Sequence, residues 1–283
     1  MDYEIIAEGL AFPEGPVVMA DGSVIVVEIL GGRITRCWNG RKETVCEPGG
    51  GPNGAAIGPD GALYVCNSGG MSHSPHVVPE EARIERIDVT TGKVDRIYES
   101  CDGERLSAPN DLMFDTDGNI WFTDNGRTVD RGKEWGGLYC ARPDGSSITR
   151  IKGHALSYNG VGLSPDMSTV YIADTYSARV YAFDRRIEAQ EPRLLATVPG
   201  PVMLDSLAMT EAGNVCVAAV TGWAMATVTP DGKVSMTKVD DRLVTNIAFG
   251  GDDMMDAWLT FSEKGTLAKY RWHEPGLRLP FNG

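Results

Sequence analysis

The stretch NDLMFDTDGNIWFTD, residues 110–124, contains the pattern that decides the fold. A polar residue leads a short apolar run, an Asp-Gly turn follows, and a second apolar run comes back. Glycine and small polar residues tolerate the positive φ angles that tight turns require. The stretch therefore predicts a β-hairpin.

This pattern occurs six times along the chain. In every copy the turn residue stands seven positions after the leading polar residue, and successive leading residues are 39 to 57 positions apart. The copies are EGPVVMADGSVIVVE (14–28), NGAAIGPDGALYVCN (53–67), NDLMFDTDGNIWFTD (110–124), NGVGLSPDMSTVYIAD (159–174), DSLAMTEAGNVCVAA (205–219) and NIAFGGDDMMDAWLT (246–260).

A second hairpin follows each copy, so each repeat contains four strands. Repeats of this length with strand-period alternation predict an all-β fold, a six-bladed β-propeller with four-stranded blades. Helical repeats are excluded by the same alternation, whereas two packed sheets remain an alternative. The last repeat has no clear fourth strand, and we expect YEIIAEG (3–9) to supply it and close the ring.

Composition and charge limit the partners. Apolar residues make up 42% of the chain and charged residues 23%, with no shift that marks a linker, so we expect residues 1–283 to form one domain. The net charge is -13 without a basic cluster, which argues against binding nucleic acid or an anionic membrane. The N-terminus has no basic segment followed by an apolar run, so we expect a soluble, cytoplasmic protein. The oligomeric state is left open.

In a propeller the first strand of each blade lines the channel, so the six leading residues are expected to meet at one mouth. An Asn or Asp at such a position often only caps a turn. Six oxygen-bearing side chains in one register instead indicate a ligand site, and oxygen ligands with two carboxylates suit hard cations. The six residues are Glu14, Asn53, Asn110, Asn159, Asp205 and Asn246.

Several segments resemble one known family. FPEGP (12–16), SAPND (107–111) ahead of WFTD (121–124), YNG (158–160), Asp205 and TNIAFGG (245–251) are similar to segments of SMP-30/gluconolactonase/luciferin-regenerating-enzyme-like proteins, in the same order across all six repeats. Members of that family are six-bladed propellers that hydrolyse sugar lactones or related esters with a bound divalent cation. The resemblance implies a gluconolactonase-like hydrolase acting on a small molecule.

The resemblance also implies roles for particular residues. Glu14, Asn159 and Asp205 are the expected metal ligands, and Asp205 is the expected general base. Calcium is the first choice of metal, with Zn²⁺, Mn²⁺, Mg²⁺ and Fe²⁺ as alternatives. Asn110 is expected beside the metal or on the substrate.

The substrate is expected to contact residues of the ring and of two long loops, 68–82 and 125–135, because long propeller loops often carry function. The expected substrate-binding residues are Asn110, Asn53, Asp124, His73 and Arg127. Some sugar lactonases of this family carry an arginine where this chain has Ala108, so an arginine contact to sugar hydroxyls is expected to be missing.

Two alternative functions remain. The same metal site would also suit another ester, a phosphotriester or a carbonyl substrate, and a propeller can use a metal only to stiffen a protein-binding scaffold. A serine hydrolase has little support, since no Gly-x-Ser-x-Gly motif is present.

Overall fold

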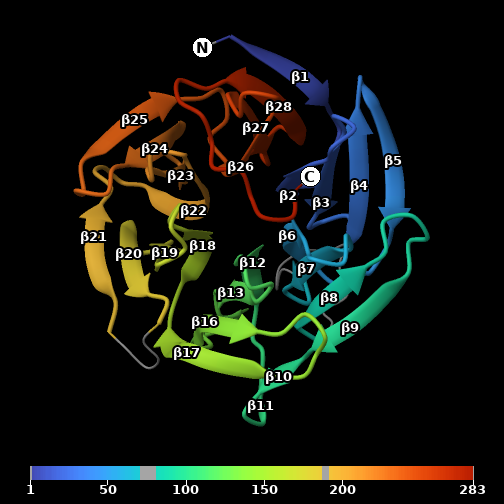
Figure 1. The fold of residues 1–283 in the computed structure, drawn as a ribbon, viewed down its shortest axis with the longest axis vertical. Helices are drawn as coiled ribbons and strands as arrows, with labels where there is room; N and C mark the ends of the chain where they lie inside the picture. The colour runs from blue at the N-terminus through green and yellow to red at the C-terminus, as the bar shows by residue number, and fades with distance from the viewer. Residues whose placement is uncertain (1, 71–80, 187–190, 283) are drawn as a thin grey trace.

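The computed structural model describes residues 2–70, 81–186 and 191–282. In these ranges the regular elements are all β-strands, and no helix that could cross a membrane occurs. Six four-stranded antiparallel sheets surround a central channel (Figure 1). The predicted six-bladed propeller is thus confirmed, and the alternative of two packed sheets is excluded.

In the first five blades the strands follow one another from the channel outward. Blade 1 is β2 (Pro13–Val18), β3 (Val24–Glu28), β4 (Arg33–Trp38) and β5 (Arg41–Cys46). Blade 2 is β6 (Pro52–Ile57), β7 (Leu63–Asn67), β8 (Arg83–Ile87) and β9 (Val94–Tyr98). Blade 3 is β12 (Pro109–Phe114), β13 (Ile120–Asp124), β16 (Gly136–Ala141) and β17 (Ile148–Ala155).

Blade 4 is β18 (Tyr158–Leu163), β19 (Thr169–Asp174), β20 (Arg179–Asp184) and β21 (Arg193–Thr197). Blade 5 is β22 (Met203–Met209), β23 (Val215–Val220), β24 (Ala224–Val228) and β25 (Val234–Lys238). Blade 6 is β26 (Val244–Gly250), β27 (Asp256–Phe261), β28 (Thr266–Arg271) and, from the other end of the chain, β1 (Tyr3–Ala7).

The N-terminal strand closes the ring, as the sequence predicted. β1 pairs antiparallel with β28, placing Tyr3 opposite Tyr270 and Ile5 opposite Ala268. The two tyrosine rings stack with centroids 5.0 Å apart, and the Tyr3 hydroxyl donates to Asp240 at 2.7 Å. This pairing covers the outer edge of β28, which would otherwise be an open sheet edge.

The core consists of six apolar clusters, and each cluster lies between two neighbouring blades. Between blades 1 and 2, for example, Ile25 and Ile34 pack with Leu63 and Ile87. All four side chains are at most 1% exposed. Because each cluster needs residues from both of its blades, the ring is stabilised mainly by contacts between blades.

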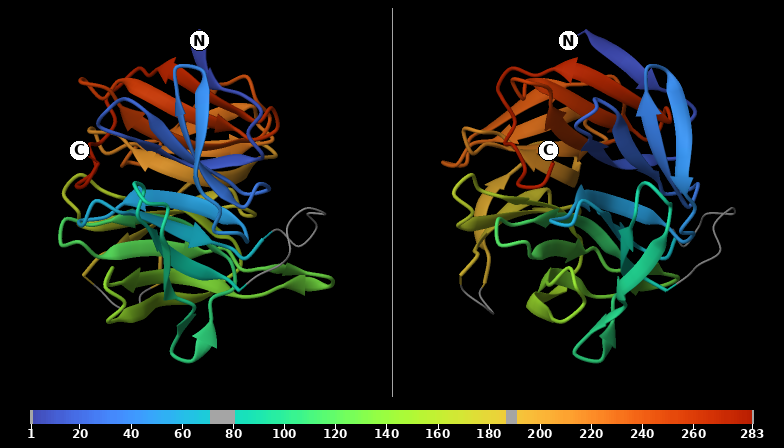
Figure 2. Two further views of the ribbon diagram at one scale, coloured as in Figure 1. Left: turned by 90° about the vertical axis from the view of Figure 1, so that its right-hand side faces the viewer. Right: turned by 45° about the vertical axis from the view of Figure 1, so that its right-hand side comes forward.

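The channel has two different ends. The inner strands begin at one end, which we call the upper mouth, and the short β14–β15 hairpin (Thr128–Val129, Gly132–Lys133) extends beyond the blades there. A second short hairpin, β10–β11 (Ser100–Cys101, Glu104–Arg105), projects outward from the rim of the ring (Figure 1). At the lower mouth lie the Asp-Gly turns. Figure 2 shows the β14–β15 hairpin projecting from one side of the ring while the C-terminus lies on the other.

The C-terminal segment, residues 272–282, covers the lower mouth (Figure 1). It is held by a hydrogen bond from the Leu277 amide to the Met209 carbonyl at 2.8 Å. Leu277 then packs on the cluster of blades 4 and 5, Leu279 on that of blades 3 and 4, and Phe281 on those of blades 1 to 3. The segment therefore contacts most of the ring.

Deletion of residues 1–8 should open the ring between blades 6 and 1. We expect the melting temperature to fall by roughly 10 °C or more, because about 2–4 °C is lost per kcal/mol in a chain of this size, or the protein to oligomerise through the exposed edge of β28. Thermal melting with size-exclusion chromatography measures both. Glu4→Ala, at an exposed side chain of the same strand, is the control, and an unchanged monomeric deletion variant would contradict closure by β1.

Candidate functional site

Side chains of the repeated polar residues converge at the upper mouth. Five of them line one cavity of about 260 Å³: Glu14, Asn53, Asn110, Asn159 and Asp205. The sixth, Asn246, donates through Nδ2 to Glu14 Oε2 at 2.7 Å and lines a smaller cavity deeper in the channel. The fixed register of the sequence repeat therefore corresponds to one shared site in space.

A β-bulge aims these side chains into the channel. In all six blades the pairing of the first two strands shifts register at or directly beside the polar residue. In blade 4, for instance, Asn159 and Gly160 together stand opposite a single residue of β19. A bulge bends the strand and reorients its side chains, which is why bulges often occur at functional sites.

Close contacts between inner strands explain the glycine that follows several of the polar residues. A Cβ on Gly160 would lie 2.7 Å from the Asp205 carbonyl oxygen in the next blade. A Cβ on Gly15 would lie 2.5 Å from the Asn53 carbonyl oxygen. These distances leave no room for a side chain, so glycine lets neighbouring blades approach closely at the ring.

Three oxygens of the ring are buried without a hydrogen-bond partner. They are Glu14 Oε1, Asn110 Oδ1 and Asn159 Oδ1. Other atoms of the same side chains are satisfied: Glu14 Oε2 accepts from the Gly15 amide and from Asn246, and Asn159 Nδ2 donates to the Thr175 hydroxyl at 3.2 Å. An unpartnered buried oxygen is costly, so three of them facing one cavity fit a cation.

The electrostatics of the ring favour the same ligand. Burial raises the pKa of Glu14, and burial together with the Glu14 charge raises the pKa of Asp205 well above its usual range. Burial and the Glu14 charge also raise the pKa of Asp111, which follows Asn110, to about 8. In the described part of the chain no lysine or arginine forms an ion pair with any of these carboxyls.

The candidate metal set combines two carboxylates with amide oxygens. Among residues 2–70, 81–186 and 191–282, no three His, Cys, Asp or Glu side chains gather in an arrangement that could hold a metal ion. A site here would therefore depend on an amide oxygen such as that of Asn159 as well as on Glu14 and Asp205. Oxygen donors of this kind suit Ca²⁺ and similar hard cations.

The cavity wall is partly apolar and partly cationic. Phe12, Ile29 and Ala108 supply apolar surface. Arg127 and Lys133 come from the β14–β15 region. Tyr176, from the loop after β19, lies under the Lys133 ammonium, 5.4 Å from nitrogen to ring centroid. The cavity therefore combines a polar floor with a wall suited to an organic ligand.

Comparison with known proteins agrees with this geometry. The model of the family described as SMP-30/Gluconolactonase/LRE-like region matches residues 12–263. The chain belongs to this family. The resemblance noted in the sequence is thus confirmed, and the match includes every residue proposed above for the ring.

Relatives in this family include lactonases. A gluconolactonase of Zymomonas mobilis is 27% identical over 209 residues, 64% of this chain and 55% of its own length. The chain spans about half the length of the curated relatives it matches first. A solved gluconolactonase of Xanthomonas campestris has a TM-score of 0.78 at 24% identity, covering 94% of this chain and 87% of its own. A calcium-binding regucalcin of Agrobacterium tumefaciens has a TM-score of 0.79 at 19% sequence identity, and the match covers 98% of each chain.

The predicted substrate-binding residues of this SMP-30/gluconolactonase family member do not all lie in the cavity. Asn53, Asn110 and Arg127 line the cavity. Asp124 is 1% exposed, and its carboxylate accepts from the Ser107, Ala108 and Gly126 amides at 2.7 to 2.9 Å. It thus fixes the loop backbone that leads into Asn110. His73 lies outside the described residues.

Two residues of the site were missed by sequence reasoning. Asp111 follows Asn110 where Asn53 and Asn159 are followed by glycine, and that departure was a usable signal. Tyr176 lies two residues beyond a strand end and is 59% exposed. Nothing in the repeat pattern distinguishes it from an ordinary loop tyrosine.

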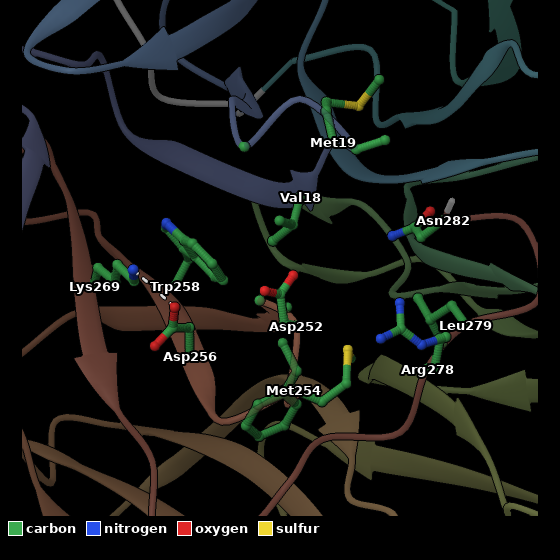
Figure 3. Close-up of a pocket in the computed structure, with 15 residues that line it drawn as sticks. Val18, Met19, Asp252, Met254, Asp256, Trp258, Lys269, Arg278, Leu279 and Asn282 are labelled. Carbon is green, nitrogen blue, oxygen red and sulfur yellow. Dashed lines mark ion pairs between the residues drawn. The ribbon is translucent and has the colours of Figure 1, made fainter.

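The lower mouth contains a second cavity of about 310 Å³, shown in Figure 3. Its charged groups are partly paired: Lys269 binds Asp256 at 2.8 Å and lies 5.1 Å from the centroid of the Trp258 ring system. The remaining wall includes Val18 and Met254. The six repeated polar residues lie at the upper end, so the upper cavity is the candidate active site in this family member.

Gly160→Ala should disturb both the ring and the fold, because the added Cβ meets the backbone of blade 5. Overpacking of this kind costs about 1–3 kcal/mol. We expect a lower melting temperature and weaker divalent-cation binding, measured by differential scanning calorimetry and isothermal titration calorimetry. Gly132→Ala is the matched control, since its Cβ would meet no atom within 4 Å; equal effects of the two substitutions would contradict the close-packing argument.

Proposed function

We propose that this chain is a metal-dependent hydrolase that opens a lactone ring at the upper mouth of the channel. The observation that carries the proposal is the set of three buried, unpartnered oxygens, Glu14 Oε1, Asn110 Oδ1 and Asn159 Oδ1, beside Asp205. The lactonases among its relatives support the reaction class.

The metal ligands in this proposal are Glu14, Asn159 and Asp205, with calcium as the first choice. Two carboxylates would balance the charge of one divalent cation, and the amide oxygen of Asn159 gains the partner that it lacks in the protein alone. When bound, such a cation polarises an ester carbonyl and stabilises negative charge on its oxygen. The calcium-binding regucalcin with the same fold is consistent with this choice.

The side chains of the chain itself supply the remaining steps. Asp205 orients a water molecule and accepts its proton at a carboxylate oxygen while the water attacks the carbonyl carbon. The ring C–O bond then breaks, and the proton passes to the alkoxide that leaves, so lactone and water give one hydroxy acid. In this proposal the Asn110 amide, which lines the cavity, hydrogen-bonds the substrate, and the apolar wall limits access of further water.

Asp205→Asn should abolish lactone hydrolysis, since an amide accepts no proton from water. We expect kcat to fall at least about 10²-fold, within the range that general acid–base catalysis contributes. A pH-stat assay on a panel of lactones and aryl esters measures the loss. Glu43→Gln, on the exposed outer strand β5, serves as control. Full activity in a metal-loaded Asp205→Asn protein would refute the role of Asp205 as general base. Metal binding by the unchanged protein without turnover of any ester would favour a non-catalytic propeller.

Removal of the cation should destabilise the protein more at high pH than at low pH. Because the folded-state pKa values of Glu14, Asp205 and Asp111 are raised, the cation-free native state keeps protons that the unfolded chain releases above pH ~4. Its stability therefore falls as pH rises from ~4 toward about 8, the pKa of Asp111. A cation displaces these protons, so its stabilisation grows over the same window.

This effect is measured by melting temperatures with EDTA or Ca²⁺ at pH 5 and pH 8. A cation at 100 times its Kd stabilises by about 2.7 kcal/mol, and we expect a larger Ca²⁺-induced increase at pH 8. Glu14→Gln removes one of the carboxyls and should reduce the Ca²⁺-induced increase in melting temperature at both pH values. An increase that is independent of pH, and unchanged in Glu14→Gln, would contradict cation binding at the ring.

A further inference from the structure

Lys133 is a half-buried cation on the wall of the candidate site. It ends the β14–β15 hairpin, and its side chain turns back toward the channel. The ammonium donates to Asn125 Oδ1 and to the Gly126 carbonyl, both at 2.7 Å, and lies above the Tyr176 ring. These contacts fix the position of the charge within the cavity that Glu14, Asn159 and Asp205 also line.

Among the described residues, no carboxylate lies within ion-pair distance of the Lys133 ammonium. Both of its acceptors are neutral, and in the ranges that the structure describes it forms no ion pair. The carboxylates whose field reaches it are Asp124 and Asp174. The Asp124 carboxylate accepts hydrogen bonds from three backbone amides, and the Asp174 carboxylate accepts hydrogen bonds from the Ser157 and Ser177 hydroxyls.

The lysine of the lower cavity provides a contrast. Lys269 also lies over an aromatic ring, but it pairs with Asp256 at 2.8 Å (Figure 3). Burial lowers the pKa of Lys133, while the Asp124 and Asp174 carboxylates act in the opposite direction without a direct ion pair. A buried charge of this kind is typical of functional sites, where a ligand can provide a direct partner.

Arg127 brings a second positive charge to the same wall. It lines the cavity, and its Nη2 donates to the Ser68 carbonyl at 3.2 Å. A divalent cation held by Glu14 and Asp205 would offset the charge of these carboxylates, and Lys133 would remain as a positive charge on the wall. The field at the mouth would then attract an anion.

We propose that Lys133, with Arg127 beside it, forms an anion-binding subsite, and that the lactone accepted by this site carries a carboxylate or an equivalent acidic substituent. This inference rests on the proposed function, because it names the substrate class of the same site. In it Lys133 binds the substituent, while the ring opening stays with Asp205. The hydroxy acid that leaves would be a dianion.

A matched pair of substrates tests the proposal. They are 5-oxotetrahydrofuran-2-carboxylate and the corresponding carboxamide, which differ in charge at a fixed ring, assayed by proton release with saturating Ca²⁺. We expect kcat/KM to favour the acid by about tenfold or more, since a hydrogen bond to a charged group contributes about 1.5–3 kcal/mol. Lys133→Gln should remove most of this preference through KM, and Lys133→Arg should retain part of it.

Arg131→Gln is the charge-matched control. Arg131 belongs to the same hairpin, but it is exposed and absent from the cavity lining. Its loss should leave the preference for the acid unchanged. An equal loss of preference in Arg131→Gln and Lys133→Gln would indicate a general field effect and overturn the subsite. Melting temperatures of all variants establish that they are folded.

A binding measurement separates this inference from the proposed reaction. Glutarate and butyrate differ by one carboxylate, and calorimetry on the Ca²⁺-loaded protein should give about tenfold tighter binding of glutarate, lost in Lys133→Gln. Tighter binding of glutarate without hydrolysis of either lactone would refute the proposed reaction but support the anion-binding subsite. Equal hydrolysis of both lactones, lowered equally by Lys133→Gln, would retain the reaction and overturn the subsite. Equal binding of the two acids would also overturn it.

Discussion

The pairing of β1 with β28 is the constraint on which the rest of the molecule depends. Six blades bury their apolar faces only against one another, so an open ring would leave two faces and two edges in water. Closure by the first strand fixes all six inner strands around one axis. The ring of polar side chains exists because each of those strands then begins at the same height.

That ring works against the stability of the fold. Buried carboxyls at Glu14, Asp111 and Asp205 repel one another, and three oxygens lack partners. A propeller selected only for stability would place apolar or mutually hydrogen-bonded side chains at these positions. The clusters between blades offset this cost, and the rigidity of closely packed inner strands keeps the oxygens directed at one point. A bound cation would reduce the repulsion between these carboxyls.

Much of this organisation was predictable from the sequence, because it is periodic. The six hairpins, their register and the return of Tyr3 to the last blade follow from turn chemistry and strand period. The bulges at the ring did not follow, since a one-residue slip leaves little trace beyond a glycine such as Gly160. Asp124 was predicted as a substrate contact, and its hydrogen bonds to backbone amides became visible only in the folded loop. The partners of Lys133, Asn125 and Gly126, likewise lie in a loop outside the repeat.

The C-terminal segment makes the two ends of the channel different. Leu277, Leu279 and Phe281 lie across the lower mouth and pack on the clusters of blades 1 to 5. The candidate site lies at the opposite end of the channel, so substrate and product would share the upper mouth. A product that lingers on the wall excludes the next substrate, so the release of product and the capture of substrate compete for the same groups.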